Sequence, residues 1–314
     1  MSPKGRGERP MVPAAQPRSY YGLPILNQPV WEWPIPVYFF TGGTAGAAAV
    51  MAAVGATKGD RAVVRHGRLT AVGGVMLSLP LLVKDLGRPA RFMNMLRVFK
   101  PTSPMSVGSW LVGAFVVAAA ASAAAELSGR YRLLGDAAGY AAGLLGLGMS
   151  TYTAVLLADT AVPVWHEARV ALPFEFSGSS AAAAGGLAMI TLGSERSSAV
   201  RRFAALGAAM ELTAAKVSHR RLGPLSSAYR EGTAGRIEIA GSVLALGGGI
   251  TALAAGGSRA ARIAAGTMLL GGALSKRWAV FEAGKRSAAD PSHTVAPQRR
   301  RSHPELPGDG PVLG

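Results

Sequence analysis

The 314-residue chain contains no cysteine. Without thiolates it cannot itself hold a Cys-ligated iron–sulfur cluster or form a disulfide. Histidine is also scarce: His66, His166 and His219 lie near the ends of apolar runs, and the other two of the five lie near the C-terminus. No pair faces another across an apolar run, so we expect no haem and no metal site. If this chain handles electrons, a partner must supply or accept them.

The chain also has few charged residues. Charged residues make up 16% of the chain, against roughly 25% in soluble domains, while 49% is hydrophobic and glycine alone accounts for 41 residues. Small side chains suit close helix packing in lipid. The net charge of +16 does not indicate nucleic-acid binding, because the basic residues flank apolar runs instead of forming a face interleaved with aromatics. The composition predicts an integral membrane protein.

Apolar runs long enough to cross a bilayer core of about 30 Å, which takes about 20 helical residues, occur eight times. They are 35–57, 62–86, 105–128, 133–161, 174–194, 198–220, 233–256 and 260–282. We therefore predict an all-α integral membrane protein with eight transmembrane helices in two four-helix bundles. Charges at the ends of the second and sixth runs leave a soluble helical bundle as the alternative for those two.

Four segments follow from these runs. Residues 1–34 are expected to form an N-terminal tail and interfacial segment, 35–161 the first bundle, 162–284 the second, and 285–314 a disordered tail. The first apolar run begins too late for a signal peptide, so no cleaved signal is expected. Of the 33 lysines and arginines, 22 fall on the side that holds both termini. The positive-inside rule then predicts a multi-pass protein of the cell membrane with both termini in the cytoplasm.

The connector at residues 84–110 is polar and basic, yet it separates two apolar runs. Asp85 ends one run, and Arg88, Arg91 and Arg97 follow it. An acid at membrane depth is costly, so it is a functional candidate by default. Asp85 is either a proton-exchanging group or an interfacial acid paired with Arg88 or Arg91.

Three further candidates lie in or after the fourth run. Tyr152 and Asp159 are seven residues apart, about two helical turns, and so share a helix face. A phenol can donate a hydrogen bond to a carbonyl, although Tyr152 could equally serve packing and Asp159 could simply end a helix. His166 can titrate near neutral pH, but as a metal ligand it lacks partners.

Two acids lie in the C-terminal half. Glu211 is the most central acid of any run, and Lys216, five residues on, has poor geometry for pairing on one helix. A partner for Glu211 must come from another helix. Glu238 begins the seventh run, where we expect an interfacial position.

Several motifs over residues 20–185 resemble the NrfD family, the polysulfide-reductase-type membrane subunits. They are Tyr21-Gly-Leu-Pro, Trp31-Glu-Trp-Pro, Gly42-Gly-Thr-Ala-Gly46, Asp85-Leu-Gly-Arg-Pro-Ala-Arg-Phe92, Pro101-Thr-Ser-Pro-Met-Ser-Val-Gly-Ser-Trp110, Ser150-Thr-Tyr-Thr-Ala-Val-Leu-Leu157 and Pro163-Val-Trp-His166. The Asp-Leu-Gly-Arg-Pro and Pro-Thr-Ser-Pro elements are the most specific. The C-terminal half matches mainly by hydropathy.

The resemblance implies two four-helix bundles, a quinone site, and docking to a ferredoxin-like iron–sulfur subunit that connects to a molybdopterin-type catalytic subunit. Tyr152 matches the family's quinone-site tyrosine. Tyr38 stands where some members have histidine, and their asparagine is missing here. Candidate quinone-binding residues are thus Tyr152, Tyr38, Glu32 and His166.

Our leading hypothesis is a membrane-anchoring subunit that reacts with menaquinone or ubiquinone. In it Asp85 and Asp159 supply protons, Arg88 and Arg91 dock the iron–sulfur partner, and the chain carries no haem, cluster or metal of its own. The alternative is a transporter or a structural membrane protein without a redox role.

Overall fold

A computed structural model describes residues 26–85, 94–193 and 197–294, and over these ranges the chain is helical and contains no strand. This confirms the predicted all-α class. The helices are α1 (Pro34–Thr57), α2 (Arg61–Asp85), α3 (Pro104–Ser128), α4 (Arg132–Ala158), α5 (Pro163–Glu167), α6 (Leu172–Thr191), α7 (Ser197–Leu222), the 3₁₀ segment η3 (Gly223–Tyr229), α8 (Gly232–Ala254) and α9 (Arg259–Ala289).

Each of the eight long helices in these ranges overlaps one predicted run. Five of them, α1 to α4 and α8, are long and apolar enough to cross a membrane. The crossing of α6, α7 and α9 stays a prediction. One boundary is corrected: α9 continues past 282 to Ala289, so residues 285–289 are helix and not tail. Beyond it His293 is buried, 3.0 Å from the Ser227 hydroxyl of η3.

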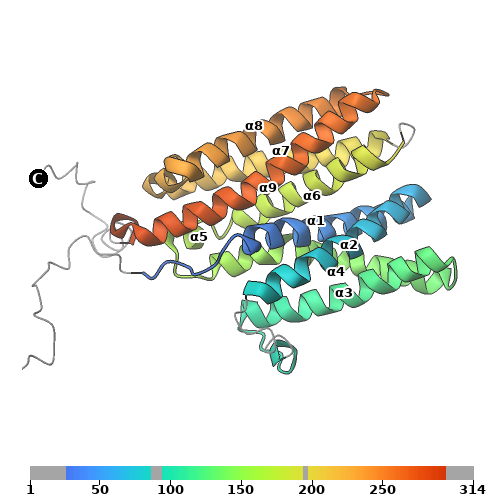
Figure 1. The fold of residues 1–314 in the computed structure, drawn as a ribbon, viewed down its shortest axis with the longest axis horizontal. Helices are drawn as coiled ribbons and strands as arrows, with labels where there is room; N and C mark the ends of the chain where they lie inside the picture. Colours follow the sequence, from blue (N-terminus) through green and yellow to red (C-terminus); the bar gives the residue numbers. More distant parts are fainter. Residues whose placement is uncertain (1–25, 86–93, 194–196, 295–314) are drawn as a thin grey trace, which may run out of the picture.

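The long helices gather in two groups that lie side by side (Figure 1). In one group α1 packs on α2 and α4, and α3 packs on α4; in the other α6 packs on α7 and α9, and α8 on α7 and α9. The groups meet mainly where α1 and α4 contact α6 and where α1 contacts α9. The start of α1 and the end of α9 lie at the same end of the molecule (Figure 1).

Local signals set several helix ends. Ser103 caps α3 by accepting a hydrogen bond from the Ser106 N–H at 3.4 Å, and Pro104 occupies the first turn, where its missing N–H costs nothing. Gly129 ends α3 in a left-handed conformation with φ 67°. Ser258 caps α9 in the same way, through the Ala261 N–H. These caps set the ends of helices whose apolar runs were located by hydropathy and length.

The backbones of α1 and α4 approach each other closely at two glycines. A Cβ added to Gly46 would lie 2.7 Å from the Gly146 carbonyl oxygen, and one added to Gly146 would lie 2.4 Å from the Gly46 carbonyl oxygen. A Cβ added to Gly42, one turn earlier on α1, would lie 3.4 Å from the Ser78 hydroxyl of α2 and 3.8 Å from the Met149 side chain of α4. Both small residues therefore face close neighbours, as the Gly42-to-Gly46 spacing suggests.

Substitution of Gly46 should measure this contact. Gly46→Ala places a methyl group against backbone that cannot rotate away, so we expect a loss of stability of about 1–3 kcal/mol. The matched control is Gly73→Ala on α2, where an added Cβ meets nothing within 4 Å. Thermal unfolding in detergent should show a lower midpoint for Gly46→Ala alone. Equal midpoints for the two variants would contradict the contact.

Topology can be tested at the turns between helices. If α6, α7 and α9 cross the membrane together with the other five, reporters fused at Gly129, Gly193 and Gly256 should all lie on one side. A reporter after Asp290 should lie on the other, which the charge distribution predicts to be the cytoplasm. A Gly193 reporter on the cytoplasmic side would show that α6 and α7 do not span.

Candidate functional site

A cavity of about 280 Å³ opens among α1 to α4, at the end where α1 begins. Its wall is mainly apolar, and its titratable side chains are those of Tyr38, Asp85 and Tyr152. The lining residues are Trp31, Ile35, Tyr38, Phe39, Leu82, Asp85, Met95, Met105, Gly108, Ser109, Val112, Tyr152 and Leu156. An apolar cavity with a few polar groups is the usual form of a small-molecule site.

The polar groups reach this cavity from three helices. Tyr38 lies in the second turn of α1, Asp85 is the last residue of α2, and Tyr152 lies in the second half of α4. Gly108 of α3 makes room for the Tyr152 ring, because a Cβ there would lie 2.9 Å from two ring carbons. Absence of a side chain at Gly108 thus allows α3 to pack directly against the phenol ring.

The segment before α1 closes one side of the cavity. The backbone N–H of Glu32 donates to the Asp85 carboxylate, and Trp31 stacks on Trp165 with ring centroids 5.8 Å apart. Trp165 is fully buried and donates from Nε1 to the Val280 carbonyl at 2.8 Å. The second helix group therefore supports a wall of the cavity that lies in the first.

The structure brings together some of the predicted site residues. Tyr38, Asp85 and Tyr152 line the cavity, and Glu32 contacts Asp85 through its backbone while its side chain is exposed. Asp159 and His166 are exposed and do not line the cavity.

The predicted site residues that remain are His166, Arg88 and Arg91. His166 has its Nδ1 3.1 Å from the Ala158 carbonyl at the end of α4, a contact that serves the helix end. Arg88 and Arg91 lie outside the described residues.

A second polar centre, which sequence reasoning largely missed, lies inside the other helix group. Lys276 of α9 has no exposed surface; its Nζ is 2.5 Å from Glu238 of α8 and 3.3 Å from Glu175 of α6. Glu238 is thus buried against α9, contrary to the interfacial position expected for it. Glu211 of α7 is likewise fully buried nearby.

Arg277, the next residue on α9, binds α6. It donates to the Ser179 hydroxyl, to the Ser180 hydroxyl at 2.8 Å and to the Phe176 carbonyl at 2.7 Å. Its guanidinium carbon also lies 4.0 Å from the centre of the Phe176 ring. These contacts satisfy most of the hydrogen-bond donors of the Arg277 guanidinium, which has almost no exposed surface.

We call these buried charged residues the ionic cluster: Glu175, Glu211, Glu238, Lys276 and Arg277. The sequence contained a signal for it. Lys276 and Arg277 stand together inside the predicted run 260–282, and the three runs that precede it, 174–194, 198–220 and 233–256, each carry a glutamate. A cation within an apolar run needs an acidic partner from a neighbouring helix. We counted both among the topogenic charges, whereas the structure buries them.

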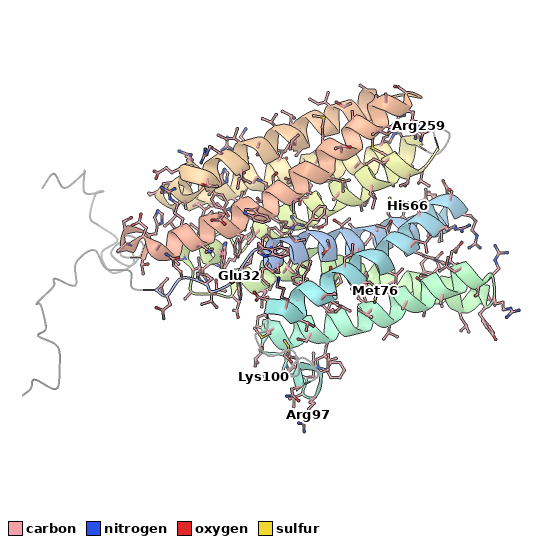
Figure 2. All side chains as sticks on the ribbon, in the orientation of Figure 1. Glu32, His66, Met76, Arg97, Lys100 and Arg259 are labelled. Carbon is pink, nitrogen blue, oxygen red and sulfur yellow. The ribbon has the colours of Figure 1, made fainter. Side chains whose placement is uncertain are left out.

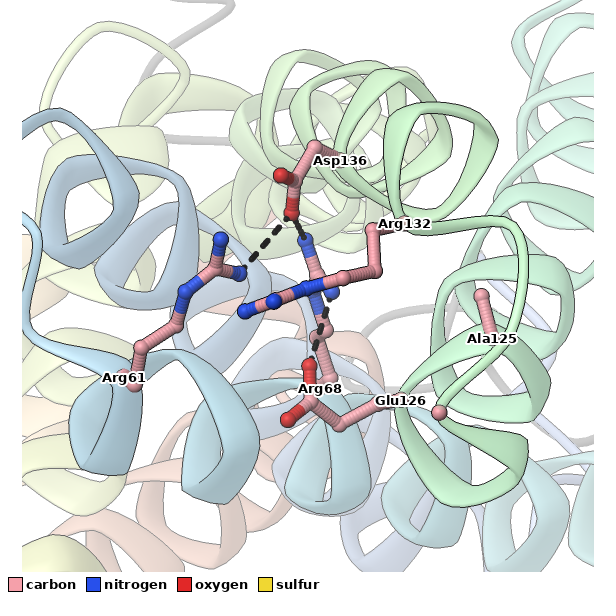
Figure 3. A pocket seen from close by; sticks show the side chains of 7 residues that line it. Arg61, Arg68, Ala125, Glu126, Arg132 and Asp136 are labelled. Carbon is pink, nitrogen blue, oxygen red and sulfur yellow. Dashed lines mark hydrogen bonds and ion pairs between the residues drawn. The ribbon is translucent and has the colours of Figure 1, made fainter.

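A third polar feature lies at the opposite end of the first group. Arg68 of α2 is buried and bridges Glu126 of α3 at 2.9 Å and Asp136 of α4 at 2.6 Å, and Arg61 reaches Asp136 at 3.3 Å (Figure 3). With Arg132 they border a cavity of about 250 Å³. The pairs join three helices at this end, and within the described ranges no group of side chains could hold a metal ion.

Taken together, the fold and cavity define a helical membrane protein with an apolar small-molecule pocket. The chain belongs to the polysulphide reductase NrfD family, whose model matches residues 24–217. Members of this family are membrane subunits of quinone-linked oxidoreductases. Comparison with curated proteins gives no match. The match includes α1 to α6 and most of α7, and therefore the whole cavity.

The ionic cluster should be essential for stability. Lys276→Met leaves Glu175 and Glu238 without their shared cation, and breaking a buried ion pair in this way costs about 3–5 kcal/mol. The control is Lys216→Met on α7, whose side chain is exposed. Thermal unfolding in detergent should show a large loss only for Lys276→Met. Wild-type stability in that variant would mean that Lys276 does not compensate the carboxylates.

Proposed function

We propose that this chain is the quinone-reactive membrane subunit of a multisubunit oxidoreductase and that its substrate binds in the cavity among α1 to α4. The observation that carries the proposal is the presence of Tyr152 and Asp85, from α4 and α2, in the wall of one apolar cavity. A quinone headgroup is flat and apolar and has two carbonyl oxygens. The aromatic wall and the two polar groups match these needs.

Each side chain has a role that follows from its chemistry. The Tyr152 hydroxyl donates a hydrogen bond to a quinone carbonyl oxygen. Asp85 exchanges a proton with that headgroup, since reduction of a quinone takes up two electrons and two protons. Tyr38 and Trp31 enclose the ring and limit water. Because Asp159 and His166 do not line the cavity, we assign them no contact with the headgroup.

Electrons would enter from an iron–sulfur partner docked at this end of the molecule. Arg97 and Lys100 are exposed in the connector before α3, at the end where Glu32 also lies (Figure 2). Together with Arg88 and Arg91 they make this connector basic. We propose that an acidic surface of a ferredoxin-like subunit, itself attached to a molybdopterin-type subunit, binds here.

The membrane arrangement belongs to the same proposal. The eight long helices would cross as two four-helix bundles, with both termini, the connector and the quinone cavity toward the cytoplasm. All the groups discussed for quinone chemistry would then lie on the side from which a cytoplasmic partner docks.

Two substitutions should affect quinone chemistry differently. Tyr152→Phe removes only the hydroxyl, a hydrogen bond of about 0.5–1.5 kcal/mol, so the apparent KM for quinone should rise roughly twofold to tenfold. Asp85→Asn keeps the shape and removes the titrating group, so kcat should fall more than KM rises. Quinone-coupled activity of the intact complex measures both.

Tyr140→Phe is the matched control, because Tyr140 lies on the same helix with an exposed ring outside the cavity. Its kinetics should equal those of the wild type. Unchanged kinetics in Tyr152→Phe and Asp85→Asn, with the complex assembled, would contradict this cavity as the site. No quinone dependence at all would favour the transporter or structural alternative.

A further inference from the structure

Glu211 is the one carboxylate of the ionic cluster that the ion pairs described above leave out. It lies midway along α7, its side chain has no exposed surface, and neither of its oxygens accepts a hydrogen bond from the described residues. Its backbone is held against α6, because a Cβ at Gly178 would lie 2.5 Å from the Glu211 nitrogen. The position is therefore built into the contact between two helices.

Charged groups from three other helices surround it. Glu175 of α6, Glu238 of α8, and Lys276 and Arg277 of α9 all act electrostatically on Glu211. Lys276 and Arg277 carry two positive charges, which Glu175 and Glu238 balance. An ionised Glu211 would add an uncompensated negative charge in the interior of the protein, and such a charge is costly. Neutrality of the cluster requires one more bound positive charge.

A chain of titratable groups leads from this cluster toward the end of α7. Glu238 lies 3.8 Å from Nε2 of His219, whose side chain is 26% exposed. Tyr229 of η3 faces the His219 ring at 5.0 Å, and burial, reinforced by Glu175 and Glu238, raises the pKa of the Tyr229 phenol well above its ordinary value. The other charged side chains on this part of α7, those of Lys216, Arg220 and Arg221, are exposed. His219 is thus the group that connects the cluster with the surroundings.

We propose that Glu211 binds an exchangeable proton and that the second helix group thereby contains a proton-transfer site of its own. Uptake forms an O–H bond on the Glu211 carboxylate and makes the cluster neutral; release breaks that bond and returns the proton through Glu238 and His219. No electrons move in this step. A proton fits better than a metal ion, because no group of ligating side chains in the described ranges could hold a metal.

This site is separate from the quinone cavity. The ring centroids of Phe39, in the cavity wall, and Phe176 are 6.1 Å apart. The Arg277 guanidinium lies over the Phe176 ring. Two aromatic rings therefore stand between the cavity and the cluster along this line. The inference does not depend on quinone binding, and its test does not measure quinone activity.

Infrared spectroscopy of the full-length chain, purified with the subunits that accompany it, tests the proposal. A protonated carboxylic acid has its own carbonyl stretch, which shifts on exchange into heavy water. We expect wild-type protein at neutral pH to show this band and Glu211→Gln to lose it completely. Glu231→Gln, which changes an exposed carboxylate paired with Arg286, should retain the band.

A second variant covers the case in which Glu211→Gln does not fold. Glu211→Asp keeps a carboxyl group on a shorter side chain, so the band should shift in frequency and remain. Absence of the band in the wild type, or its persistence unchanged in both Glu211 variants, would overturn the proposal. Loss of the band on titration with sodium at fixed pH would also overturn it, since the cluster would then bind a metal cation.

Discussion

The backbone contact between Gly46 of α1 and Gly146 of α4 sets the positions of the side chains that line the apolar cavity. Tyr38 lies eight residues before Gly46 and Tyr152 six residues after Gly146, about 12 Å and 9 Å along their helices. Both therefore reach the same end of the bundle, where the cavity opens. Close approach of these two helices leaves no room for larger residues, and it brings the two phenols to one cavity.

α1 also connects the two polar centres. A Cβ at Gly43 would lie 2.5 Å from the Ser180 hydroxyl and 3.2 Å from Arg277, so α1 packs directly on the helices that hold the ionic cluster. The cavity and the cluster thus share one central helix while aromatic rings separate them. The helix group α1 to α4 contains an apolar pocket for a small molecule. The group α6 to α9 encloses two cations and two carboxylates that balance them, together with the further carboxylate of Glu211.

Helix positions could be predicted because long apolar runs are a local signal. Serine caps and a left-handed glycine, which the structure shows at several ends, are local as well. The cavity was partly predictable: Tyr152 came from a family motif, and Asp85 from the cost of an acid at a run's end. Asp159 follows the last residue of α4 as its C-cap and is exposed, which its seven-residue spacing from Tyr152 does not reveal. The pairing of Lys276 with Glu175 and Glu238 joins three helices, and only the packing of the chain determines it.

Mapping a bound quinone analogue tests the central claim most directly. A photoreactive quinone, activated on the intact complex, should label peptides from α1, the start of α3 and the second half of α4, including Tyr38, Met105 or Tyr152. Excess unlabelled quinone should prevent this labelling. Competed labels confined to α7, α8 or α9, or no competed label on this chain, would contradict a quinone site in the cavity.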